Sequence, residues 1–159
     1  MNIEFVNNYE EAIKCNELLT KLIKSEKEFN ENINENYKVS EWFENFYNNS
    51  MNVIIVAKDN EVIVGYLFCR ITTVDNGPMI EHEALLDGLY VESEYRNKVI
   101  ATQLINSAKK WCMDRDVKYL NLEVYENNVA ALNLYHKAGF KELERKLRLK
   151  IDVEEMKNG

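Results

Sequence analysis

Residues 84–113 decide the fold: they read A-L-L-D-G-L-Y-V, then E-S-E-Y-R-N-K-V-I-A, then T-Q-L-I-N-S-A-K-K-W-C-M. The first piece is a mostly apolar run of strand length. The last piece repeats apolar residues at the spacing of a helix with one buried face, namely Ala101, Leu104, Ile105, Ala108, Trp111 and Cys112. A strand that turns directly into a helix points the free N–H groups of the first helical turn at one place, which favours an anion. We therefore interpret residues 96–102, with the basic Arg96 and Lys98, as a candidate phosphate-binding turn.

The composition is typical of one globular domain over residues 1–159, with 46% hydrophobic and 30% charged residues. No apolar run approaches the roughly 18 residues of a membrane span, and the first residues lack the pattern of a secretion signal. The cysteines Cys15, Cys69 and Cys112 lack metal-ligand spacing and indicate free thiols, so we expect a cytoplasmic protein without a metal or a membrane partner. The net charge of −7 argues against nucleic acid as a partner.

The first half of the chain predicts a strand over residues 3–6, a helix over residues 9–24 and a polar surface loop over residues 25–38. The two strands of an antiparallel hairpin are expected over residues 53–57 and 62–71, and a second loop over residues 72–82. Asn7 or Asn8 is available to begin the helix. Between the first loop and the hairpin, Ser40 is expected to cap a short helix that turns three aromatic residues inward, Trp42, Phe43 and Phe46.

The second half predicts strands over residues 84–91 and 117–124, and the helix between them makes these strands parallel. A helix over residues 128–138 follows, and Gly139 ends it. Apolar residues then alternate with charged ones in an expected final strand, at Leu143, Leu147, Leu149 and Ile151. The fold class is α/β (α+β): a mixed central sheet with antiparallel N-terminal strands, one parallel pair and flanking helices.

The turn after residue 91 resembles motif A of the GNAT N-acetyltransferases, whose pattern is Arg/Gln-x-x-Gly-x-Gly/Ala. Arg96 takes the first position and Ala101 the last. Val99 stands where the family usually has glycine, which serves where φ is positive or a ligand approaches the backbone closely. A β-branched residue is strained at positive φ, so we expect Val99 to keep a negative φ.

Residues 127–142, N-N-V-A-A-L-N-L-Y-H-K-A-G-F-K-E, resemble motif B of the same family, N-x-x-A-x-x-L-Y-x-K-x-G-F. The matching residues are Asn128, Ala131, Leu134, Tyr135, Lys137, Gly139 and Phe140. An amphipathic helix with a glycine stop explains most of these residues, and Asn128 could be only its cap. Both motifs lie at the family's spacing and on the expected elements, so the chain is identified as a member of the GNAT superfamily.

The resemblance implies a single-domain GNAT-like fold with a cofactor core over about residues 53–143 and an acceptor-side region over about residues 9–50. It implies that acetyl-CoA is the co-substrate and that the two parallel strands splay apart where the thioester lies. The pantetheine arm would follow the backbone near Leu89, Tyr90 and Val91, and Asn128 would hydrogen-bond it. The pyrophosphate would lie on the turn formed by Arg96, Asn97, Lys98, Val99, Ile100, Ala101 and Thr102.

The resemblance also implies catalytic roles. Tyr135 would donate a proton to the departing sulfur, or else its hydroxyl would pack beside the cofactor. Asp87 would contact the substrate or act as the base, and it shares a strand face with Leu85 and Leu89 unless a bulge intervenes. Other carboxylates and histidines are less favoured, namely Glu81, Glu83, Glu123, His82 and His136, and a cysteine acyl-enzyme is disfavoured because Cys69 and Cys112 look like core residues.

The expected reaction is direct attack of a primary amine on acetyl-CoA in a ternary complex. The acceptor is either a small cationic amine, such as a polyamine or an aminoglycoside, or a protein amine, and the acidic balance of the chain favours the first. A non-catalytic CoA-binding module and transfer of a longer acyl chain remain open. Homodimers are common in the family.

Overall fold

The computed structural model describes residues 1–96, 99–152 and 154. Within them, one mixed sheet has the order β1-β2-β3-β4-β5, with bounds Asn2–Phe5, Asn52–Asp59, Val62–Asp75, Ile80–Val91 and Leu120–Asn121. The helices α1, α2 and α3 are Tyr9–Ser25, Ile100–Met113 and Val129–Lys137. Three short 3₁₀ turns, η1, η2 and η3, are Glu26–Glu28, Phe43–Asn45 and Ser93–Tyr95.

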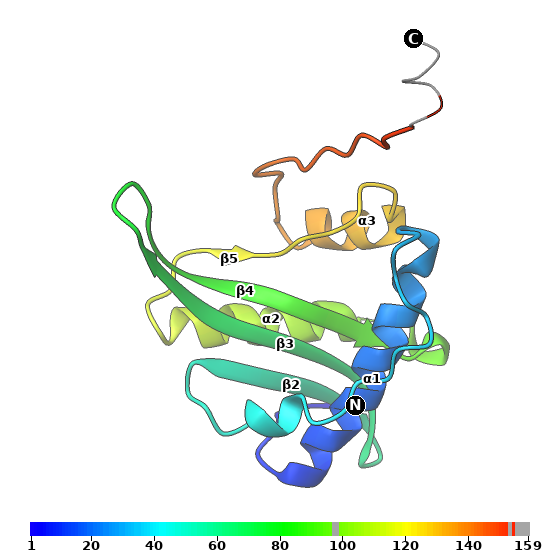
Figure 1. Cartoon of the computed structure of the whole chain (residues 1–159). Coiled ribbons are helices and arrows are strands. Elements are labelled where there is room, and N and C mark those ends of the chain that lie inside the picture. Colours follow the sequence, from blue (N-terminus) through cyan, green and yellow to red (C-terminus); the bar gives the residue numbers. More distant parts are fainter. Residues whose placement is uncertain (97–98, 153, 155–159) are drawn as a thin grey trace.

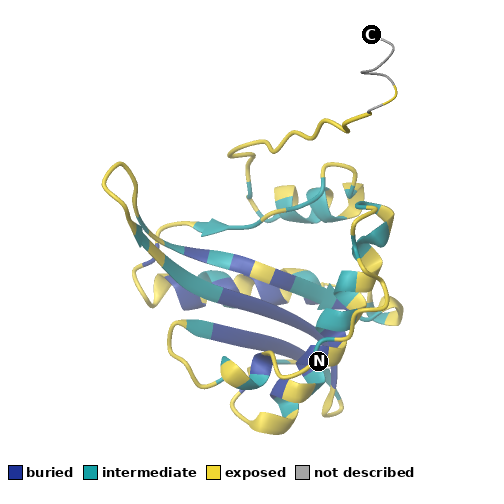
Figure 2. Ribbon diagram, viewed as in Figure 1, coloured by how far each residue is buried: buried dark blue, intermediate teal, exposed yellow. Residues whose placement is uncertain are grey.

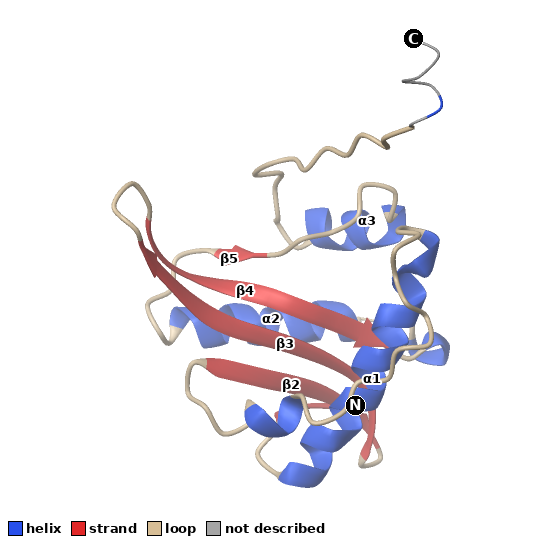
Figure 3. Ribbon diagram, viewed as in Figure 1, coloured by secondary structure: helices blue, strands red, loops and turns tan. Residues whose placement is uncertain are grey.

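The first four strands are antiparallel neighbours, and β4 and β5 are parallel. Helices cover both faces of the sheet (Figures 1 and 3). This is the mixed α+β sheet with flanking helices that the sequence predicts, so the fold class is confirmed. The predicted hairpin is confirmed as well, with Asn60 and Glu61 at positive φ in its turn.

Alternation along the central strands divides the core into two layers. Ile55, Leu67 and Cys69 pack with α2 on one face, and α3 adds partly buried residues to that layer. Tyr66 and Phe68 pack with α1 on the other face. Buried residues therefore follow the middle of the sheet, while its ends are more exposed (Figure 2).

Helix α1 is fixed at its start by Asn8, whose side-chain oxygen accepts from the Glu11 N–H at 2.9 Å. The Asn8 amide in turn donates to the Glu11 carboxylate at 2.6 Å, so the two side chains form a reciprocal cap. Lys58 on β2 pairs with Glu11 and with Glu4 on β1. These contacts tie α1 to the first two strands and fix the face on which it lies.

The pairing of β4 with β5 is short. Ala84 pairs with Leu120 and Leu85 with Asn121, and no further pair joins the two strands among the described residues. The predicted strand over residues 117–124 is therefore wrong in length, because the chain leaves β4 after Asn121. Within the part of the chain that the structure describes, the edge of β4 from residue 86 to residue 91 has no neighbouring strand on that side, as the splayed pair requires.

Two other predicted elements also differ from the structure. The loop over residues 72–82 is wrong, because β3 and β4 pair out to Asp75 and Ile80 and only residues 76–79 turn. The helix capped by Ser40 is a single 3₁₀ turn without a side-chain cap. Phe43 at its start is buried, whereas Trp42 is 39% exposed instead of turned inward.

The predicted final strand is wrong, because residues 141–152 form neither strand nor helix. The segment runs away from the sheet (Figures 1 and 3), and it pairs with no strand among residues 1–96, 99–152 and 154. Its apolar side chains are 71–87% exposed: Leu143, Leu147, Leu149 and Ile151. Alternation alone does not make a strand without a partner edge.

Candidate active site

The N-terminus of α2 has the features of an anion-binding site. Among the described residues, the first bond of the helix runs from the Gln103 N–H to the Val99 carbonyl at 2.9 Å, and the N–H groups of residues 100–102 lie in the first turn, ahead of that bond. Within the same described residues, no side chain caps the helix and no acidic residue lies in its first turn. Val99 keeps a φ of −72°, as expected, and its side chain is 66% exposed, so valine fits this turn without backbone strain.

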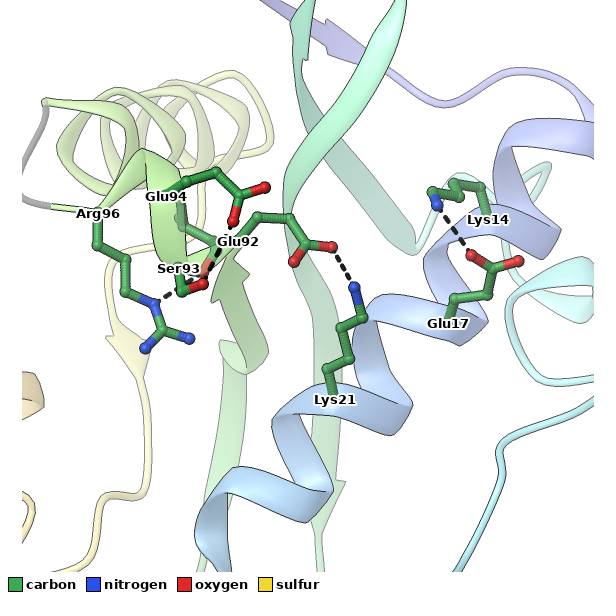
Figure 4. Close-up of polar contacts among 8 residues, drawn as sticks. Lys14, Glu17, Lys21, Glu92, Ser93, Glu94 and Arg96 are labelled. Atoms are coloured by element: carbon green, nitrogen blue, oxygen red, sulfur yellow. Dashed lines mark hydrogen bonds and ion pairs between the residues drawn. The ribbon is translucent and has the colours of Figure 1, made fainter.

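The side chains around this turn have different positions. Ile100 is buried in the core, Ala101 is half-buried and Thr102 is exposed, so Ile100 presents only its backbone to a ligand. The exposed Arg96 donates from Nε to the Val91 carbonyl at 2.9 Å (Figure 4). Its guanidinium carbon lies 5.2 Å from the centre of the Tyr90 ring. The predicted Asn97 and Lys98 lie outside the described residues.

Two backbone N–H groups of β4 face its open edge, as the directions of the neighbouring hydrogen bonds indicate. The Glu92 N–H donates across to the Val64 carbonyl of β3 at 2.8 Å. Successive N–H groups of a strand point to opposite edges. The N–H groups of Leu89 and Val91 therefore face the edge that β5 leaves, beside the start of α2. The half-buried Leu89 packs on the α2 face.

A β-bulge interrupts β4 at Asp87. Phe68 pairs with Gly88 and Cys69 pairs with Leu86, so Asp87 is the extra residue. A bulge re-aims a side chain, and here it separates Asp87 from Leu89. Leu89 packs with the α2 layer, whereas Asp87 lines a cavity with Tyr66 and Phe68 on the α1 face.

The Asp87 carboxylate pairs with Arg70 on β3, at 3.1 Å from its Nη2. Burial raises the pKa of Asp87, the Arg70 charge opposes this rise, and Glu123 adds to it. A carboxylate whose pKa is raised holds a proton more readily than an ordinary aspartate, which suits a base better. Asp87 is still about one-third exposed, so substrate can reach it.

The cavity on the α1 face has a volume of about 300 Å³. Aromatic side chains dominate its wall, including Tyr37, Trp42, Phe43, Tyr66 and Phe68, and Asp87 is the acidic residue among its lining. Aromatic faces and a carboxylate are the groups that receive an organic cation. The cavity and the open edge of β4 thus meet at residues 87–89.

Motif B lies on α3, where Asn128 caps the helix by accepting from the Ala131 N–H at 3.2 Å. The cap uses one lone pair of its side-chain oxygen, and its amide N–H₂ group is the side-chain donor for a cofactor arm. Tyr135 packs edge-on against Phe140, with ring centres 5.7 Å apart. Burial, followed by the charge of Glu26, raises the pKa of Tyr135 to about 12, which keeps its hydroxyl protonated and makes it a weaker acid than free tyrosine.

Three of the less favoured candidates make contacts elsewhere. Glu83 accepts from the Asn121 side chain at the end of β5, and Glu81 pairs with Val74 far along the β3–β4 ribbon. His136 pairs with Glu142, and both residues are exposed. All three cysteines are buried free thiols, and burial raises the pKa of Cys15 to about 12, which opposes thiolate chemistry there.

Sequence reasoning missed three residues of this region: Tyr66, Arg70 and Glu26. Glu26 lies where α1 ends, is half-buried, and has its pKa raised by that burial. Its charge raises the pKa values of both Tyr66 and Tyr135. The sequence around it, S-E-K-E, is indistinguishable from a solvated surface segment.

A sequence profile of the acetyltransferase (GNAT) family matches residues 17–140. The chain therefore belongs to the acetyltransferase (GNAT) family. A streptothricin acetyltransferase of Escherichia coli is 42% identical over 57 residues, which are 36% of this chain and 33% of that protein. The match spans about a third of that curated relative.

Solved structures share the fold. A mutant BH1408 protein from Bacillus halodurans has a TM-score of 0.80 at 18% identity, over 95% of this chain and 99% of that chain. An aminoglycoside acetyltransferase from an uncultured soil metagenomic sample has a TM-score of 0.72 at 16% identity, over 96% and 95%. Aminoglycoside N-acetyltransferase AAC(6′)-Iy, solved with CoA, has a TM-score of 0.65 at 17% identity, over 96% and 100%.

Across residues 1–96, 99–152 and 154, no helix combines the length and the apolar character needed to span a membrane. Among the same residues, no cluster of three or more His, Cys, Asp or Glu side chains is arranged to hold a metal ion.

Proposed function

We propose that the protein is an acetyl-CoA-dependent N-acetyltransferase that moves an acetyl group to a primary amine by direct attack in a ternary complex. One observation carries the proposal. The unpaired edge of β4 lies beside the uncapped start of α2, and the bulge at Asp87 joins that edge to an aromatic cavity. A cofactor groove and an acceptor cavity that meet at one point are what acyl transfer needs.

The residues of the chain fit acetyl-CoA. The N–H groups of residues 100–102 would hold its pyrophosphate, because they lie in the first turn of α2, at the positive end of the helix dipole. The exposed Arg96 adds a positive charge there. The backbone of Leu89 and Val91 would pair with the pantetheine arm as an added strand does, and the Asn128 amide would donate to the same arm.

The same residues supply the chemistry of the reaction. The Leu89 N–H is positioned to donate to the acetyl carbonyl oxygen, where negative charge develops. An alkyl ammonium is mostly protonated at neutral pH, with a pKa of about 10.4, so a base must remove its proton before attack. Asp87 is the candidate for that role. Tyr135 stays protonated and would hydrogen-bond the departing sulfur.

The acceptor belongs to one of two classes, a small cationic amine or a protein amine. The cavity favours the first, because its volume of about 300 Å³ suits part of a small molecule and its lining combines aromatic rings with a carboxylate. Resemblance to streptothricin and aminoglycoside acetyltransferases supports the same choice.

Homodimer formation is part of the proposal. Four exposed apolar residues with mostly strand-like spacing follow α3, namely Leu143, Leu147, Leu149 and Ile151. A second copy of the chain would cover them. Sedimentation of the purified protein should then give the mass of a dimer.

The function is tested by release of the CoA thiol from acetyl-CoA in the presence of a panel of amines. The panel contains spermidine, kanamycin, a peptide with a free N-terminus and a lysine peptide. We expect thiol release with at least one small cationic amine, together with a rise in the melting temperature when acetyl-CoA binds. A melting shift without thiol release would indicate a CoA-binding module, and the absence of both would refute the proposal.

A further inference from the structure

The hydroxyl of Tyr66 is buried without a hydrogen-bond partner among the described residues. Tyr66 lies in the middle of β3 and is 0% exposed. Buried polar groups in native proteins nearly always have a partner, because leaving one unsatisfied is energetically unfavourable. A missing partner beside a cavity indicates that a ligand supplies it.

The position of Gly88 locates this hydroxyl. A Cβ atom built on Gly88 would lie 2.7 Å from the Tyr66 oxygen, so the oxygen rests against the backbone of Gly88. Gly88 lies between Asp87, at the bulge, and Leu89, whose N–H faces the open edge of β4. Tyr66 and Asp87 line the same cavity. The unpaired oxygen is therefore at the point where the acceptor cavity meets the proposed acetyl site.

The charges around Tyr66 decide which kind of group it receives. Burial, together with negative charge at Asp87 and Glu26, raises the pKa of Tyr66 well above its usual value. The phenol therefore stays neutral, and its surroundings favour a positive charge over a negative one. An oxyanion would be repelled here, whereas an ammonium or amine N–H would be attracted and can donate to the lone pair of the phenol oxygen.

We propose that the Tyr66 hydroxyl binds the reacting primary amine of the acceptor by accepting one of its N–H hydrogens, while the Asp87 carboxylate accepts another. This assignment rests on the proposed function. The ammonium gives its third proton to one oxygen of Asp87, and the other Asp87 oxygen accepts the second N–H of the neutral amine. With both remaining N–H groups held, the lone pair of the amine is directed toward the open edge at Leu89. Tyr66 thereby orients the nitrogen for attack.

The test is the Tyr66→Phe variant, assayed with acetyl-CoA and the best acceptor of the amine panel. We expect kcat/KM for the amine to fall about tenfold, as loss of one hydrogen bond predicts, with KM for acetyl-CoA unchanged. The melting temperature of the free protein should stay the same or rise, because the variant removes an unpaired polar atom. Tyr47→Phe is the matched control, since Tyr47 packs against the same core layer but does not line this cavity.

Each outcome decides between the alternatives. Unchanged amine kinetics in Tyr66→Phe, with an active wild type, would overturn the assignment and leave the proposed function standing. A change confined to KM for acetyl-CoA would also overturn it. A lowered melting temperature would show that the hydroxyl has a structural partner in the chain. A wild type that releases no thiol with any amine would remove the proposed function itself.

Discussion

Substitution of Gly88 by alanine tests the geometry at the junction of the two sites. The new methyl group would lie 2.7 Å from the Tyr66 hydroxyl oxygen and 3.4 Å from the ring carbon that carries it. The first distance is a steric clash, whereas the second is ordinary van der Waals contact. The clash is therefore almost entirely with one oxygen atom, and Tyr66→Phe removes that atom.

The magnitude follows from overpacking. Inserting a methyl group into a packed core costs about 1–3 kcal/mol. For a chain of this size each kcal/mol lowers the melting temperature by about 2–4 °C. We expect Gly88→Ala to destabilise the wild type by this amount and to be close to neutral when Tyr66→Phe is also present. The coupling energy between the two changes should then be about 1–3 kcal/mol, within the range found for residues in contact.

The assay is urea unfolding followed by circular dichroism on four proteins: the wild type, each single variant and the double variant. Gly88→Ala is thus compared in two backgrounds, the wild type and Tyr66→Phe. Any general effect of alanine in a strand appears in both, so each background is the control for the other. Equal destabilisation by Gly88→Ala in both backgrounds would refute the position assigned to the hydroxyl.

Three further changes test individual side chains of the site. Arg96→Ala should weaken CoA binding, measured by calorimetry, with an unchanged melting temperature; unchanged affinity would exclude Arg96 from the site. Tyr135→Phe should lower kcat more than it changes the affinity for acetyl-CoA, and the opposite pattern would make Tyr135 a binding residue. Burial raises the pKa of Asp87, and only its ionised form accepts a proton, so kcat/KM should fall on acidification at a higher pH than for an ordinary aspartate. Asp87→Asn should lower activity and abolish that acid limb, and an identical pH profile would exclude Asp87 as the base.

Much of the cofactor side could be predicted from the sequence, because its signals are local. The apolar spacing of residues 100–113 defined α2, and the run before it defined the end of β4. The negative φ of Val99 followed from β-branching alone. An asparagine cap for α1, at Asn7 or Asn8, was predicted from residue type and position, and the structure has Asn8 in that place.

The acceptor side could not be predicted, because its features depend on pairs of strands. At the bulge, β4 contains one residue more than the facing part of β3, namely Asp87. This mismatch exists only in the pairing of the two strands, so the sequence of either strand alone does not show it. The burial of the Tyr66 hydroxyl depends on Gly88 across the sheet and on α1 above it. Glu26 enters the site only because α1 ends there.

The C-terminal error has a related cause. The alternation from Leu143 to Ile151 is a correct strand pattern, but a strand also needs an edge to pair with. Within the described residues this segment pairs with no strand, and its apolar side chains remain exposed. The periodicity of the sequence indicates which side chains would lie on one face of a strand. The strand itself forms only if a neighbouring strand pairs with it.

Amide hydrogen exchange with and without acetyl-CoA tests the central claim most directly, namely that the cofactor lies along the open edge of β4 and on the start of α2. The account predicts that saturating acetyl-CoA slows exchange at Leu89, at Val91 and at residues 100–102, and leaves β1 and β2 unchanged. Unchanged exchange at all of these β4 and α2 positions would contradict the account, whether acetyl-CoA binds elsewhere on the protein or does not bind at all.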